Sequence, residues 1–549
     1  MKIIIIGAVA AGTSAAAKAR RNSEEADIVI YEKDSFISYS GCGMPYFIGG
    51  EVENAEELTP RDPAFFKKKY NVEIRTLHEV LVIHPDKKCV EVKNLTTGEV
   101  FTDHYDTLVL ATGASAVIPQ VEGADRENVF TLRNINDMNK IKTFLDTRKP
   151  KTAAIIGTGF IGLEVCENLK RLGIEINLIE RLPQVTPGLD IDMAVYVKEE
   201  IEKNGVSVHL NVTALEISEY GVILSSGEEV QADIVLISAG VRPNTTLAKE
   251  TGIELGENGA IRVDRKMKTN VEGIYACGDC IEQFHLVTGK PIYRPLGSTA
   301  NKTGRITGDV ITGGTVEFKG VLGTGIFKIF DKTVAQTGLS EREARENGYD
   351  VAVCHNIKLN KPDYMGGKEM VIKAVADKRD GRLLGVQIVG YDGVDKRIDV
   401  FVTAITYRAN VEDLFHLDLA YAPPYSTTKD PVMYTGMILD NAITNGRPLI
   451  TASELDTLIS SGEPYNLIDA RATAQFEKNG IPSSQSIPHS KLREAANALN
   501  PDTVAVTYCN KGVTGNAAQN ILLNKGFKKV FNLSGGQKQY AKYNKEKIL

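Results

Sequence analysis

The start of the sequence lacks an apolar run long enough to cross a membrane, because MKIIIIGAVAAG has only four isoleucines before a glycine. A membrane-spanning helix needs about 20 apolar residues, and a signal peptide needs an apolar core of about 7–15. Runs of positive charge are also lacking beyond Lys67-Lys68-Lys69, and the formal net charge is -6. We therefore expect no membrane span, no signal peptide and no nucleic-acid partner.

The sequence also lacks a disulfide framework, since its seven cysteines are scattered over 549 residues. Such cysteines indicate reduced thiols and a cytoplasmic protein. Cys42, in SYSGCGMPYFIGG, has no second cysteine at the spacing that a dithiol/disulfide enzyme needs. One thiol cannot close an internal disulfide, so electrons would have to leave Cys42 through a mixed disulfide with a small thiol, a persulfide or a sulfenic acid.

What is present in the chain is ordinary globular material, with 42% hydrophobic and 24% charged residues. At about 100–200 residues per domain, this length predicts three to five domains.

A first glycine fingerprint, Gly7-Ala-Val-Ala-Ala-Gly12, follows the apolar run KIIII and precedes the small-residue segment TSAAAKARR. Val9 replaces the middle glycine of a GxGxxG motif, but a second apolar run, ADIVIYE, ends at Glu32, where a carboxylate can bind ribose hydroxyls. This order predicts an FAD-type βαβ unit, and the alternative is an ordinary β–α turn with a surface glutamate. The predicted contacts are Gly7, Val9, Ala10, Ala11, Gly12, Glu32 and Lys33.

A second fingerprint has all three glycines, at Gly157, Gly159 and Gly162, and is followed by a strand that ends at Glu180. A carboxylate at this place binds an unphosphorylated ribose and repels a 2′-phosphate, which favours NADH. Arg181 could meet a phosphate, so NADPH is the alternative. The predicted contacts are Gly157, Gly159, Phe160, Ile161, Gly162 and Glu180.

Two more segments complete a pattern: YDTLVLATGA, at residues 105–114, and TNVEGIYACGD, which ends at Asp279. In this order the motifs resemble the pyridine nucleotide-disulfide oxidoreductase family, whose FAD domain is split by an inserted NAD domain. The resemblance implies an α/β protein with two Rossmann-like dinucleotide-binding domains, an α+β dimerisation domain and a further C-terminal domain. It also implies flavin contacts from Ala111, Thr112, Gly113, Gly240, Gly278, Asp279 and Tyr421.

The implied boundaries are residues 1–115 and 243–315 for the FAD domain, 116–242 for the NAD domain and 316–440 for the dimerisation domain.

The segment around Cys42 is similar to the active-site motif of coenzyme A-disulfide reductases and the related NADH oxidases and persulfide reductases. The matching residues are Ser38, Tyr39, Cys42, Gly43, Pro45 and Tyr46. Gly41 stands where these enzymes commonly have an asparagine that contacts the substrate. Pro45 suits the first turn of a helix, so the Cys42 thiolate would lie at a positive helix end, which lowers a cysteine pKa. The alternative is a structural cysteine in a tight turn.

The same resemblance implies a coenzyme A path and a homodimer. The coenzyme contacts would be Ser14, Lys18, Arg21, Ser38, Gly41, Cys42, Lys69, Asn301 and Lys429. HLDLAYAPPYSTTKD resembles the segment that reaches across the dimer to the partner's flavin, with Tyr421, Tyr425 and Lys429. Tyr364 lies where the family has an aromatic pair, and phenols there can donate a proton to a departing thiolate. The alternatives are solvated surface charges and a loop with packing tyrosines.

Cys277-Gly-Asp-Cys280 spells CxxC but lies in the predicted flavin-binding turn, so we interpret both cysteines as packing residues. Cys89, Cys166 and Cys354 lie in apolar patterns and are expected in the core.

Residues 450–549 are similar to rhodanese domains, with the apolar run TVAVTY leading to Cys509. Backbone N–H groups in such a loop can stabilise a thiolate or persulfide anion. The family often ends this loop with an arginine, where this chain has Thr514, so Lys511 is the only cation in the loop. The chain also has no tryptophan, although many rhodaneses have one after the glycine pair found here as Gly535-Gly536. A weak or specialised sulfurtransferase, or a silent domain, would fit these changes.

The residues joining the two parts, about 441–450, include Asn, Gly and Pro, which is typical of an exposed linker that permits domain motion.

The leading hypothesis is an FAD-dependent, NADH-consuming reductase of coenzyme A disulfide, coenzyme A persulfide or polysulfide. Cys42 would be its redox centre, and Cys509 would handle sulfane sulfur. One alternative is an NADH oxidase in which Cys42 cycles as a sulfenic acid. An alternative of another class is a sulfane-sulfur carrier or sensor without turnover. No metal site is predicted.

Overall fold

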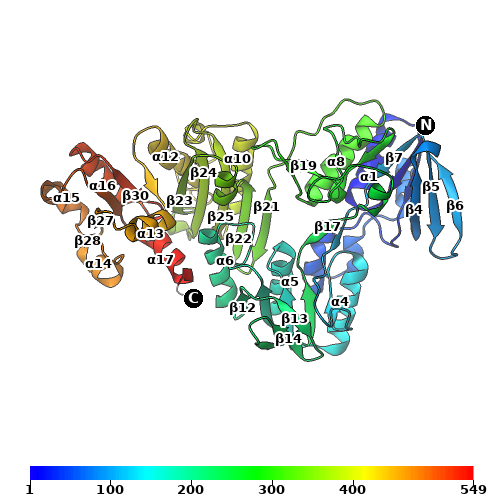
Figure 1. Ribbon diagram of the computed structural model, residues 1–549, viewed down its shortest axis with the longest axis horizontal. Coiled ribbons are helices and arrows are strands. Elements are labelled where there is room, and N and C mark those ends of the chain that lie inside the picture. Colours follow the sequence, from blue (N-terminus) through cyan, green and yellow to red (C-terminus); the bar gives the residue numbers. More distant parts are fainter. Residues whose placement is uncertain (548–549) are drawn as a thin grey trace. The chain divides into compact units, whose positions relative to one another are not determined.

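The computed structural model describes the backbone of residues 1–547 and the side chains through residue 545. The chain divides into two compact units. The first unit consists of Met1–Pro183 and Gly205–Gly323, and the second consists of Gln184–Asn204 and the chain from Thr324 onward. Helices and strands alternate in both units (Figure 1). Within residues 1–547, we find no helix with the length and apolar character needed to cross a membrane.

The first parallel sheet of unit 1 carries the first glycine fingerprint and has the order β18-β7-β1-β2-β3. Its strands are β1 (Lys2–Ile6), β2 (Asp27–Tyr31), β3 (Glu73–Arg75), β7 (Thr107–Leu110) and β18 (Ile274–Ala276). Strand β1 is the apolar run KIIII. Ile4 and Ile6 belong to one buried cluster, and Ile3 and Ile5 belong to another. The run is continuous rather than alternating because both faces of the sheet are covered.

Small residues bring two helices of this unit close together, α1 (Ala10–Asn22) and α8 (Gly297–Val310). A Cβ on Gly304 would lie 2.2 Å from the carbonyl oxygen of Ala11, and a Cβ on Gly308 would lie 2.3 Å from that of Ala15. Larger residues at these places would therefore push the helices apart. The other short helices of this part are α2 (Met44–Ile48), α3 (Pro63–Tyr70) and α7 (Thr246–Glu250).

The second parallel sheet carries the second fingerprint and has the order β12-β11-β10-β16-β9. Its elements are β9 (Val129–Phe130), α4 (Ile135–Arg148), β10 (Thr152–Ile156), α5 (Phe160–Arg171), β11 (Glu175–Glu180), β12 (Ser207–Leu210) and β16 (Ile234–Ile237). Two parallel sheets, each opened by a strand, a glycine turn and a helix, confirm the predicted pair of Rossmann-like domains.

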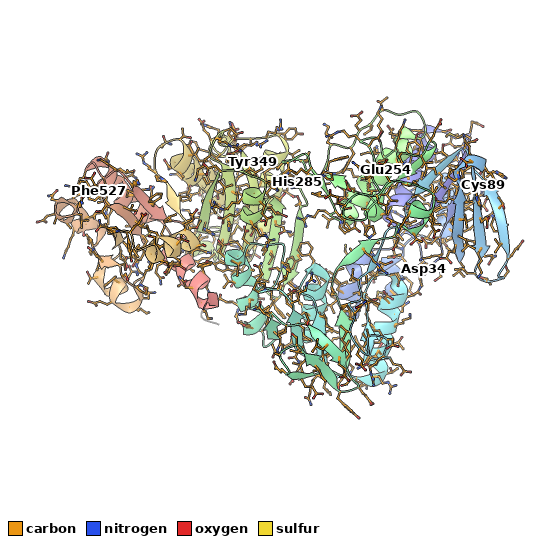
Figure 2. The ribbon with its side chains drawn as sticks, in the orientation of Figure 1. Asp34, Cys89, Glu254, His285, Tyr349 and Phe527 are labelled. Atoms are coloured by element: carbon orange, nitrogen blue, oxygen red, sulfur yellow. The ribbon has the colours of Figure 1, made fainter. Side chains whose placement is uncertain are left out.

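Small antiparallel sheets complete unit 1. Their strands are β4 (His78–His84), β5 (Cys89–Asn94), β6 (Val100–His104), β8 (Ala114–Ala116), β13 (Ala214–Ile217), β14 (Gly221–Leu224), β15 (Glu229–Gln231), β17 (Val241–Pro243), β19 (Gln283–Phe284) and β20 (Pro291–Ile292). Cys89 lies on β5 and is 3% exposed, as expected of a core thiol (Figure 2).

The first sheet of unit 2 is antiparallel and has the order β21-β22-β25-β24-β23. Its strands are β21 (Gly325–Ile329), β22 (Lys332–Gly338), β23 (Val351–Leu359), β24 (Glu369–Asp377) and β25 (Leu383–Gly390). The helices of this part are α6 (Ile191–Lys203), α9 (Glu341–Glu346), α10 (Val394–Thr406), α11 (Asp413–His416) and α12 (Pro431–Ile443). An antiparallel sheet with helices agrees with the predicted α+β dimerisation domain.

The C-terminal part of unit 2 is a parallel sheet of order β26-β30-β29-β27-β28. Its strands are β26 (Leu449–Ile450), β27 (Tyr465–Asp469), β28 (Gln485–Ser486), β29 (Val504–Tyr508) and β30 (Val530–Leu533). Its helices are α13 (Ala452–Ser460), α14 (Thr473–Asn479), α15 (His489–Ala495), α16 (Val513–Asn524) and α17 (Gly536–Lys547).

The C-terminal domain is docked on the antiparallel sheet rather than held only by its linker. The backbone N–H of His355, on β23, donates a 2.7 Å hydrogen bond to the Ser534 hydroxyl. The Tyr196 hydroxyl, on α6, donates a 2.7 Å bond to Gln539 of α17. These buried hydrogen bonds hold the C-terminal domain against the dimerisation domain. They oppose the domain motion that the composition of the linker predicts.

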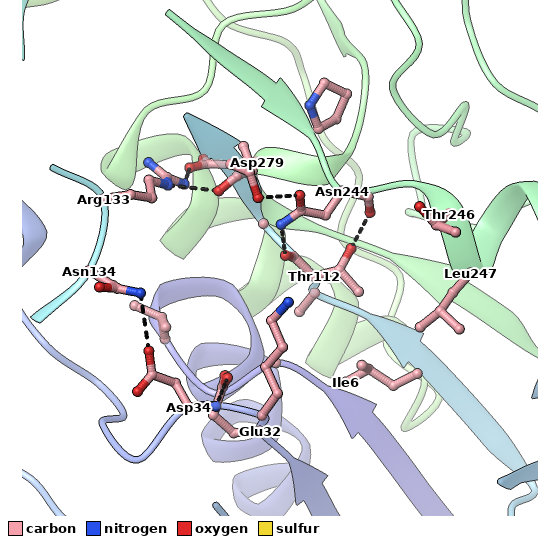
Figure 3. Close-up of a pocket in the computed structure, with 18 of the residues that line it drawn as sticks. Ile6, Glu32, Asp34, Thr112, Arg133, Asn134, Asn244, Thr246, Leu247 and Asp279 are labelled. Carbon is pink, nitrogen blue, oxygen red and sulfur yellow. Dashed lines mark hydrogen bonds and ion pairs between the residues drawn. The ribbon is translucent and has the colours of Figure 1, made fainter. Parts of the chain in front are cut away.

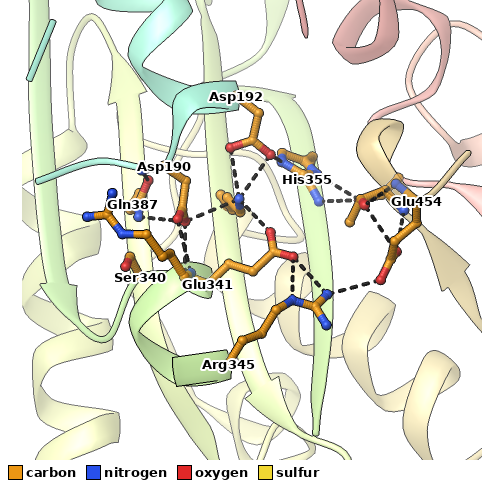
Figure 4. A network of polar contacts seen from close by, with 12 residues as sticks. Asp190, Asp192, Ser340, Glu341, Arg345, His355, Gln387 and Glu454 are labelled. Carbon is orange, nitrogen blue, oxygen red and sulfur yellow. Dashed lines mark hydrogen bonds and ion pairs between the residues drawn. The ribbon is translucent and has the colours of Figure 1, made fainter. Parts of the chain in front are cut away.

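A buried ionic network reinforces this part of unit 2 (Figure 4). The Lys373 ammonium lies 2.8 Å from Asp192, 3.1 Å from Asp190 and 2.8 Å from Glu341. Burial alone would lower the pKa of Lys373, but the surrounding carboxylates raise it far above its usual value. Removal of this one cation would leave three carboxylates without the ammonium that they share, and Asp192 and Glu341 would keep a further contact, to His355 and Arg345.

Candidate active site

A cavity of about 1130 Å³ lies at the carboxyl ends of β1, β2 and β7 (Figure 3). Ligands bind at such strand ends in open α/β sheets. Ten of the predicted flavin contacts line this cavity: Gly7, Val9, Ala10, Ala11, Glu32, Lys33, Ala111, Thr112, Gly113 and Asp279.

Only glycine fits at the first position of the turn that begins this cavity. Gly7 has φ +106°, and a Cβ on it would lie 2.2 Å from the carbonyl oxygen of Ala111. Gly12 does not line the cavity but allows α1 to approach the turn, because its Cβ would lie 1.9 Å from the oxygen of Gly7. Gly278, with φ +83°, likewise faces Ala11 rather than the cavity.

Glu32 lies where β2 ends and is 9% exposed. Its carboxylate accepts hydrogen bonds from the backbone N–H of Ala8, at 2.8 Å, and of Asp34, at 2.9 Å. Burial raises the pKa of Glu32, and the two backbone hydrogen bonds oppose that rise. Each carboxylate oxygen has more than one lone pair, so the group can also accept from ribose hydroxyls.

Several polar residues that line the cavity were not predicted from the sequence, among them Arg133, Asn134 and Asn244. The Arg133 guanidinium lies 2.8 Å from Asp279. Asn244 donates to the backbone oxygen of Thr112 at 2.9 Å, and the Thr112 hydroxyl donates back to that of Asn244 at 2.7 Å. Arg133 and Asn134 fall inside the stretch assigned to the NAD domain, so no local motif linked them to the flavin turn.

The second fingerprint forms an equivalent turn with open space above it. A Cβ on Gly157, which has φ +104°, would lie 2.4 Å from the oxygen of Ser238, so this position also requires glycine. A Cβ on Gly159 would meet no atom within 4 Å. The Glu180 carboxylate accepts a 2.7 Å hydrogen bond from the hydroxyl of Thr158, between the two glycines. The turn therefore leaves room for a phosphate group beside a carboxylate.

The remaining predicted contacts of the nucleotide domains lie close to these turns in the chain. Phe160, Ile161 and Gly162 form the first turn of α5, and Gly240, with φ +102°, lies just before β17.

Cys42 lies in a short 3₁₀ turn, Gly41–Gly43, directly before α2, and it is exposed. Pro45 lies in the first turn of α2 as predicted. The predicted lowering of the thiol pKa is wrong in this structure: burial of the sulfur raises it, and Glu164 and Asp279 raise it further, while Arg133 lowers it. Helix α2 has only five residues, so its dipole is weak, and burial together with the two carboxylates outweighs it.

Glu164, on α5, is a further residue that sequence reasoning missed. The Tyr46 hydroxyl, on α2, donates a 3.4 Å hydrogen bond to its carboxylate. Burial raises the pKa of Glu164 to about 7, and Glu167 adds to the rise. A carboxyl group that titrates near neutrality beside a thiol is typical of a functional site. The only available signal was its place two residues after Gly162.

The coenzyme A residues predicted in unit 1 fall into two groups on and near α1. The Ser14 hydroxyl donates a 2.7 Å hydrogen bond to Asn301 of α8. Arg21 and Lys69 both lie over the Tyr70 ring, at 5.7 and 5.5 Å from its centroid. These pairs bring residues together that are far apart in the sequence.

Two other predicted contacts have structural features of their own. Lys18 lies 3.0 Å from Asp309, so its charge is already paired. Ser38 has φ +48°, a conformation that costs free energy in a residue with a side chain and is often found at binding sites.

The tyrosines predicted to cross the dimer belong to unit 2. Tyr364, Tyr421 and Tyr425 are 75%, 48% and 73% exposed. Lys429 is exposed as well. Their roles stay predictions, because they depend on a second copy of the chain.

The CxxC pair is buried and unlinked, as expected of packing residues. The Cys280 sulfur lies 3.3 Å from the backbone oxygen of Cys277, and burial raises the pKa of both thiols. Cys166 and Cys354 are buried too.

Cys509 follows β29 and is 6% exposed. The backbone N–H of Gly512 donates a 3.2 Å hydrogen bond to its sulfur, and Gly512 has φ +99°. This is the inward-pointing loop that the sequence predicts. Thr514 is exposed on the first turn of α16, and the Lys511 ammonium pairs with Glu369 of β24.

Family comparisons agree with this division of the chain. Residues 1–293 match the pyridine nucleotide-disulphide oxidoreductase family, residues 325–431 match the dimerisation domain of the same family, and residues 451–543 match the rhodanese-like domain.

Three similar proteins extend the comparison. The NAD(P)H sulfur oxidoreductase (CoA-dependent) of Pyrococcus furiosus is 38% identical over 443 residues, which cover 80% of this chain and 99% of the relative. The structure of reduced CoADR-RHD from Bacillus anthracis has a TM-score of 0.96 and 38% identity and covers 99% of this chain and 98% of its own. An NAD-dependent persulfide reductase from A. fulgidus has a TM-score of 0.90 and 36% identity, with 98% and 100% covered. The chain therefore belongs to the pyridine nucleotide-disulphide oxidoreductase family, with the dimerisation domain of that family and a C-terminal rhodanese-like domain.

Proposed function

We propose that the protein is an FAD-dependent NAD(P)H oxidoreductase that reduces coenzyme A persulfide or coenzyme A disulfide through Cys42. The observation that carries this proposal is one exposed thiol beside the large cavity. All seven cysteines are free, and only Cys42 is exposed. The charges of Asp279 and Arg133, which line the cavity, shift the pKa of its thiol. Such a thiol can attack a substrate sulfur from one side, and the mixed disulfide that forms can be reduced from the other.

The cavity fits FAD in its size and in its chemistry. The turn at Gly7, which a Cβ would block, leaves backbone free to approach a pyrophosphate. Glu32 would bind the ribose hydroxyls, and Asp279, fixed by Arg133, would bind the ribityl hydroxyls. Bound FAD would relay two electrons from a nicotinamide to a mixed disulfide at Cys42.

NADH is the proposed reductant, held by the open turn at Gly159. The Glu180 carboxylate, 6% exposed, would accept from the ribose hydroxyls and repel a 2′-phosphate. We therefore expect a lower KM for NADH than for NADPH.

The proposed substrate step is an attack by the Cys42 thiolate on the coenzyme A-bound sulfur of a persulfide. A disulfide forms between Cys42 and coenzyme A, and the terminal sulfur leaves with the bonding electron pair as hydrosulfide. Two electrons from NADH then cleave the mixed disulfide and return the Cys42 thiolate. In sum, NADH, a proton and coenzyme A persulfide give NAD⁺, coenzyme A and hydrogen sulfide.

The exposed tyrosines support a homodimer as the active form. Tyr364, Tyr421 and Tyr425 leave large phenol rings in solvent, and the chain has the dimerisation domain of its family. In a dimer these phenols could donate a proton to the departing sulfur at the partner's Cys42.

Cys509 is proposed to carry the sulfane sulfur. Its thiolate would accept a sulfur atom from a donor, and the N–H of Gly512 would stabilise the resulting anion. Such a step would supply the sulfur that Cys42 later removes as hydrosulfide, which is why a persulfide is preferred to a plain disulfide.

Anaerobic oxidation of NADH with coenzyme A persulfide tests this proposal. Cys42→Ser should lower the rate by at least about a thousandfold without lowering the flavin content. The matched control is Cys89→Ala, which removes a buried sulfur of the same unit and should keep the rate. Retention of turnover in Cys42→Ser would overturn the proposal, and aerobic NADH consumption without any sulfur acceptor would favour an oxidase instead.

A further inference from the structure

The Cys509 loop is short of positive charge for a site that handles anionic sulfur. Thr514 is uncharged, and Lys511, the only cation of the loop, forms an ion pair with Glu369. Lys538, on α17, pairs with the same carboxylate. The loop itself therefore offers little net attraction to an anion.

The dimerisation domain lies directly behind this loop. A Cβ on Gly535 would lie 2.9 Å from the Cβ of His355, on β23. A Cβ on the next residue, Gly536, would lie 2.3 Å from the backbone oxygen of Cys509, which also accepts a 2.8 Å hydrogen bond from the N–H of Gln537. The Gly535-Gly536 pair thus contacts β23 at one residue and the backbone of Cys509 at the next.

Lys358 lies three residues after His355 on β23, and its ammonium group has an unusual environment. Its ammonium lies 3.8 Å from the centroid of the Tyr434 ring, and it pairs with no carboxylate anywhere in residues 1–545. Burial lowers the pKa of Lys358, and the charges of Lys429 and Lys511 lower it further. Burial raises the pKa of Tyr434, whose ring contacts the Lys358 ammonium, and the charge of Cys509 raises it further.

Three lysines from different elements are close enough for their charges to act on one another: Lys358 on β23, Lys429 in the segment before α12, and Lys511 in the Cys509 loop. Lys511 pairs with Glu369, which lies opposite Leu359 in the sheet. We name the three lysines the lysine collar. A partly desolvated ammonium over an aromatic ring attracts an anion more strongly than a solvated one, because little water must be removed from it.

We propose that the lysine collar makes the Cys509 site selective for sulfur donors that carry an oxyanion next to the sulfane sulfur, with Lys358 of the dimerisation domain supplying the charge that the loop lacks. The inference rests on the proposed role of Cys509 in sulfur transfer. The Cys509 thiolate attacks the sulfane sulfur of the donor, a new S–S bond forms, and the old S–S bond breaks with its electron pair leaving on the oxyanion-bearing fragment. With thiosulfate as donor, the products are a Cys509 persulfide and sulfite.

The experiment compares two alkylating probes of similar size on the full-length holoenzyme. Iodoacetate is an anion and iodoacetamide is neutral, and the rate at Cys509 is followed by mass spectrometry of its peptide. Lys358→Met should lower the ratio of the iodoacetate to the iodoacetamide rate by about tenfold. Lys358→Arg should keep most of the ratio, since it keeps the charge.

The matched control is Lys368→Met. Lys368 is exposed on the same hairpin, and its ammonium also lies over a tyrosine ring, 4.7 Å from the centroid of Tyr391. Unlike Lys429 and Lys511, it does not shift the pKa of Lys358. It should leave the ratio unchanged. The iodoacetamide rate reports whether the loop has kept its shape, so a damaged fold is recognised. An unchanged ratio in Lys358→Met would overturn the proposal.

Sulfur loading of Cys509 gives an independent readout. Lys358→Met should slow persulfide formation from thiosulfate by about tenfold and leave formation from neutral diallyl trisulfide unchanged. Equal losses with both donors would contradict the collar. Neither probe rate nor loading requires NADH or Cys42, so failure of the reductase proposal would be seen separately in NADH oxidation.

Protection of Cys509 from iodoacetate distinguishes two sources of the oxyanion. Protection by coenzyme A but not by inorganic sulfate would contradict the proposal, because the phosphates of coenzyme A are not next to its sulfur. Protection by sulfate as well would assign the collar to a small sulfur oxyanion. Protection by neither would count against an anion site.

Discussion

The Nε2 atom of His355 lies 2.8 Å from the carboxylate of Asp192, and both residues are buried. The same Asp192 carboxylate binds Lys373, and the Nδ1 atom of His355 lies 2.9 Å from the Ser534 hydroxyl. The helix α6, the sheet of the dimerisation domain and the C-terminal domain are thereby joined by one chain of polar contacts. Cys509 and the lysine collar depend on this docking for their geometry.

Lys373→Met should strongly destabilise unit 2. Asp190, Asp192 and Glu341 would keep their buried charges without the central cation, and breaking a buried ion pair costs about 3–5 kcal/mol. Differential scanning calorimetry of the full chain should show a lower transition temperature for this unit. Lys378→Met is the control, since Lys378 forms only an exposed pair with Asp350. This variant should change the free energy of unfolding by no more than about 1 kcal/mol.

The same network predicts loss of stability in acid. Burial alone would raise the pKa of Asp192 and of Glu341, but Lys373 brings both below their usual values. A carboxyl group with a lowered pKa stabilises the folded state above its unfolded pKa of about 4. That stabilisation is lost as the pH falls further, so unit 2 should unfold at acidic pH. The melting temperature of Lys373→Met should change less than that of the wild type between pH 6 and pH 3.

Gly159→Ala should weaken nucleotide binding without disturbing the fold. An added Cβ would meet no protein atom within 4 Å, so it can clash only with a bound ligand in the open turn. The KM for NADH should rise by about tenfold, while the flavin content and the melting temperature stay constant. Gly7→Ala is the contrasting variant, because its Cβ would lie 2.2 Å from Ala111 and should prevent flavin retention. Equal flavin loss in both variants would contradict this assignment.

Glu164→Gln should make Cys42 more reactive at alkaline pH. The Glu164 carboxylate raises the pKa of the Cys42 thiol, and a neutral amide removes that charge. Because burial raises the pKa of Glu164 itself to about 7, the carboxylate is mostly neutral at lower pH. Alkylation of Cys42 by iodoacetamide should therefore be several-fold faster in the variant above pH 7 and equal to the wild type well below it. Glu167→Gln, one turn away on α5, is the comparison variant, and its effect on Cys42 should be smaller.

The sequence predicted the parts of the molecule whose physical cause is local. The turn at Gly7 and the helix α1 follow from one strand, one glycine and a run of small residues, all within neighbouring positions. The loop around Cys509 was likewise predicted from its own strand and helix. These elements need no knowledge of distant contacts.

The rest depended on contacts between distant segments. Arg133 meets Asp279 across 146 positions, and Glu164 approaches Tyr46 across 118. The predicted lowering of the Cys42 pKa considered only its own short helix, whereas burial of the sulfur by the folded chain, and then the carboxylates of Glu164 and Asp279, raise it. The contact between Lys358 and Tyr434 could not be predicted from the sequence for the same reason, since β23 and α12 come together only in the folded protein.

Gly41→Asn tests whether the missing polar group at the active site limits this enzyme. The position has no positive φ, and a Cβ there would meet only side-chain atoms of Met44 and Tyr39, at 3.8 and 4.0 Å, which is ordinary van der Waals contact. The variant should therefore fold with unchanged flavin content and a melting temperature close to that of the wild type.

If position 41 borders the substrate, the new amide should add a hydrogen bond to it and lower the KM for coenzyme A persulfide by about three- to tenfold at constant kcat, since one such bond contributes about 0.5–1.5 kcal/mol. Gly41→Ala is the matched control, because it fills the same space without the amide and should leave the KM unchanged. An equal change in both variants would mean that the backbone at position 41, rather than a missing side chain, governs substrate binding.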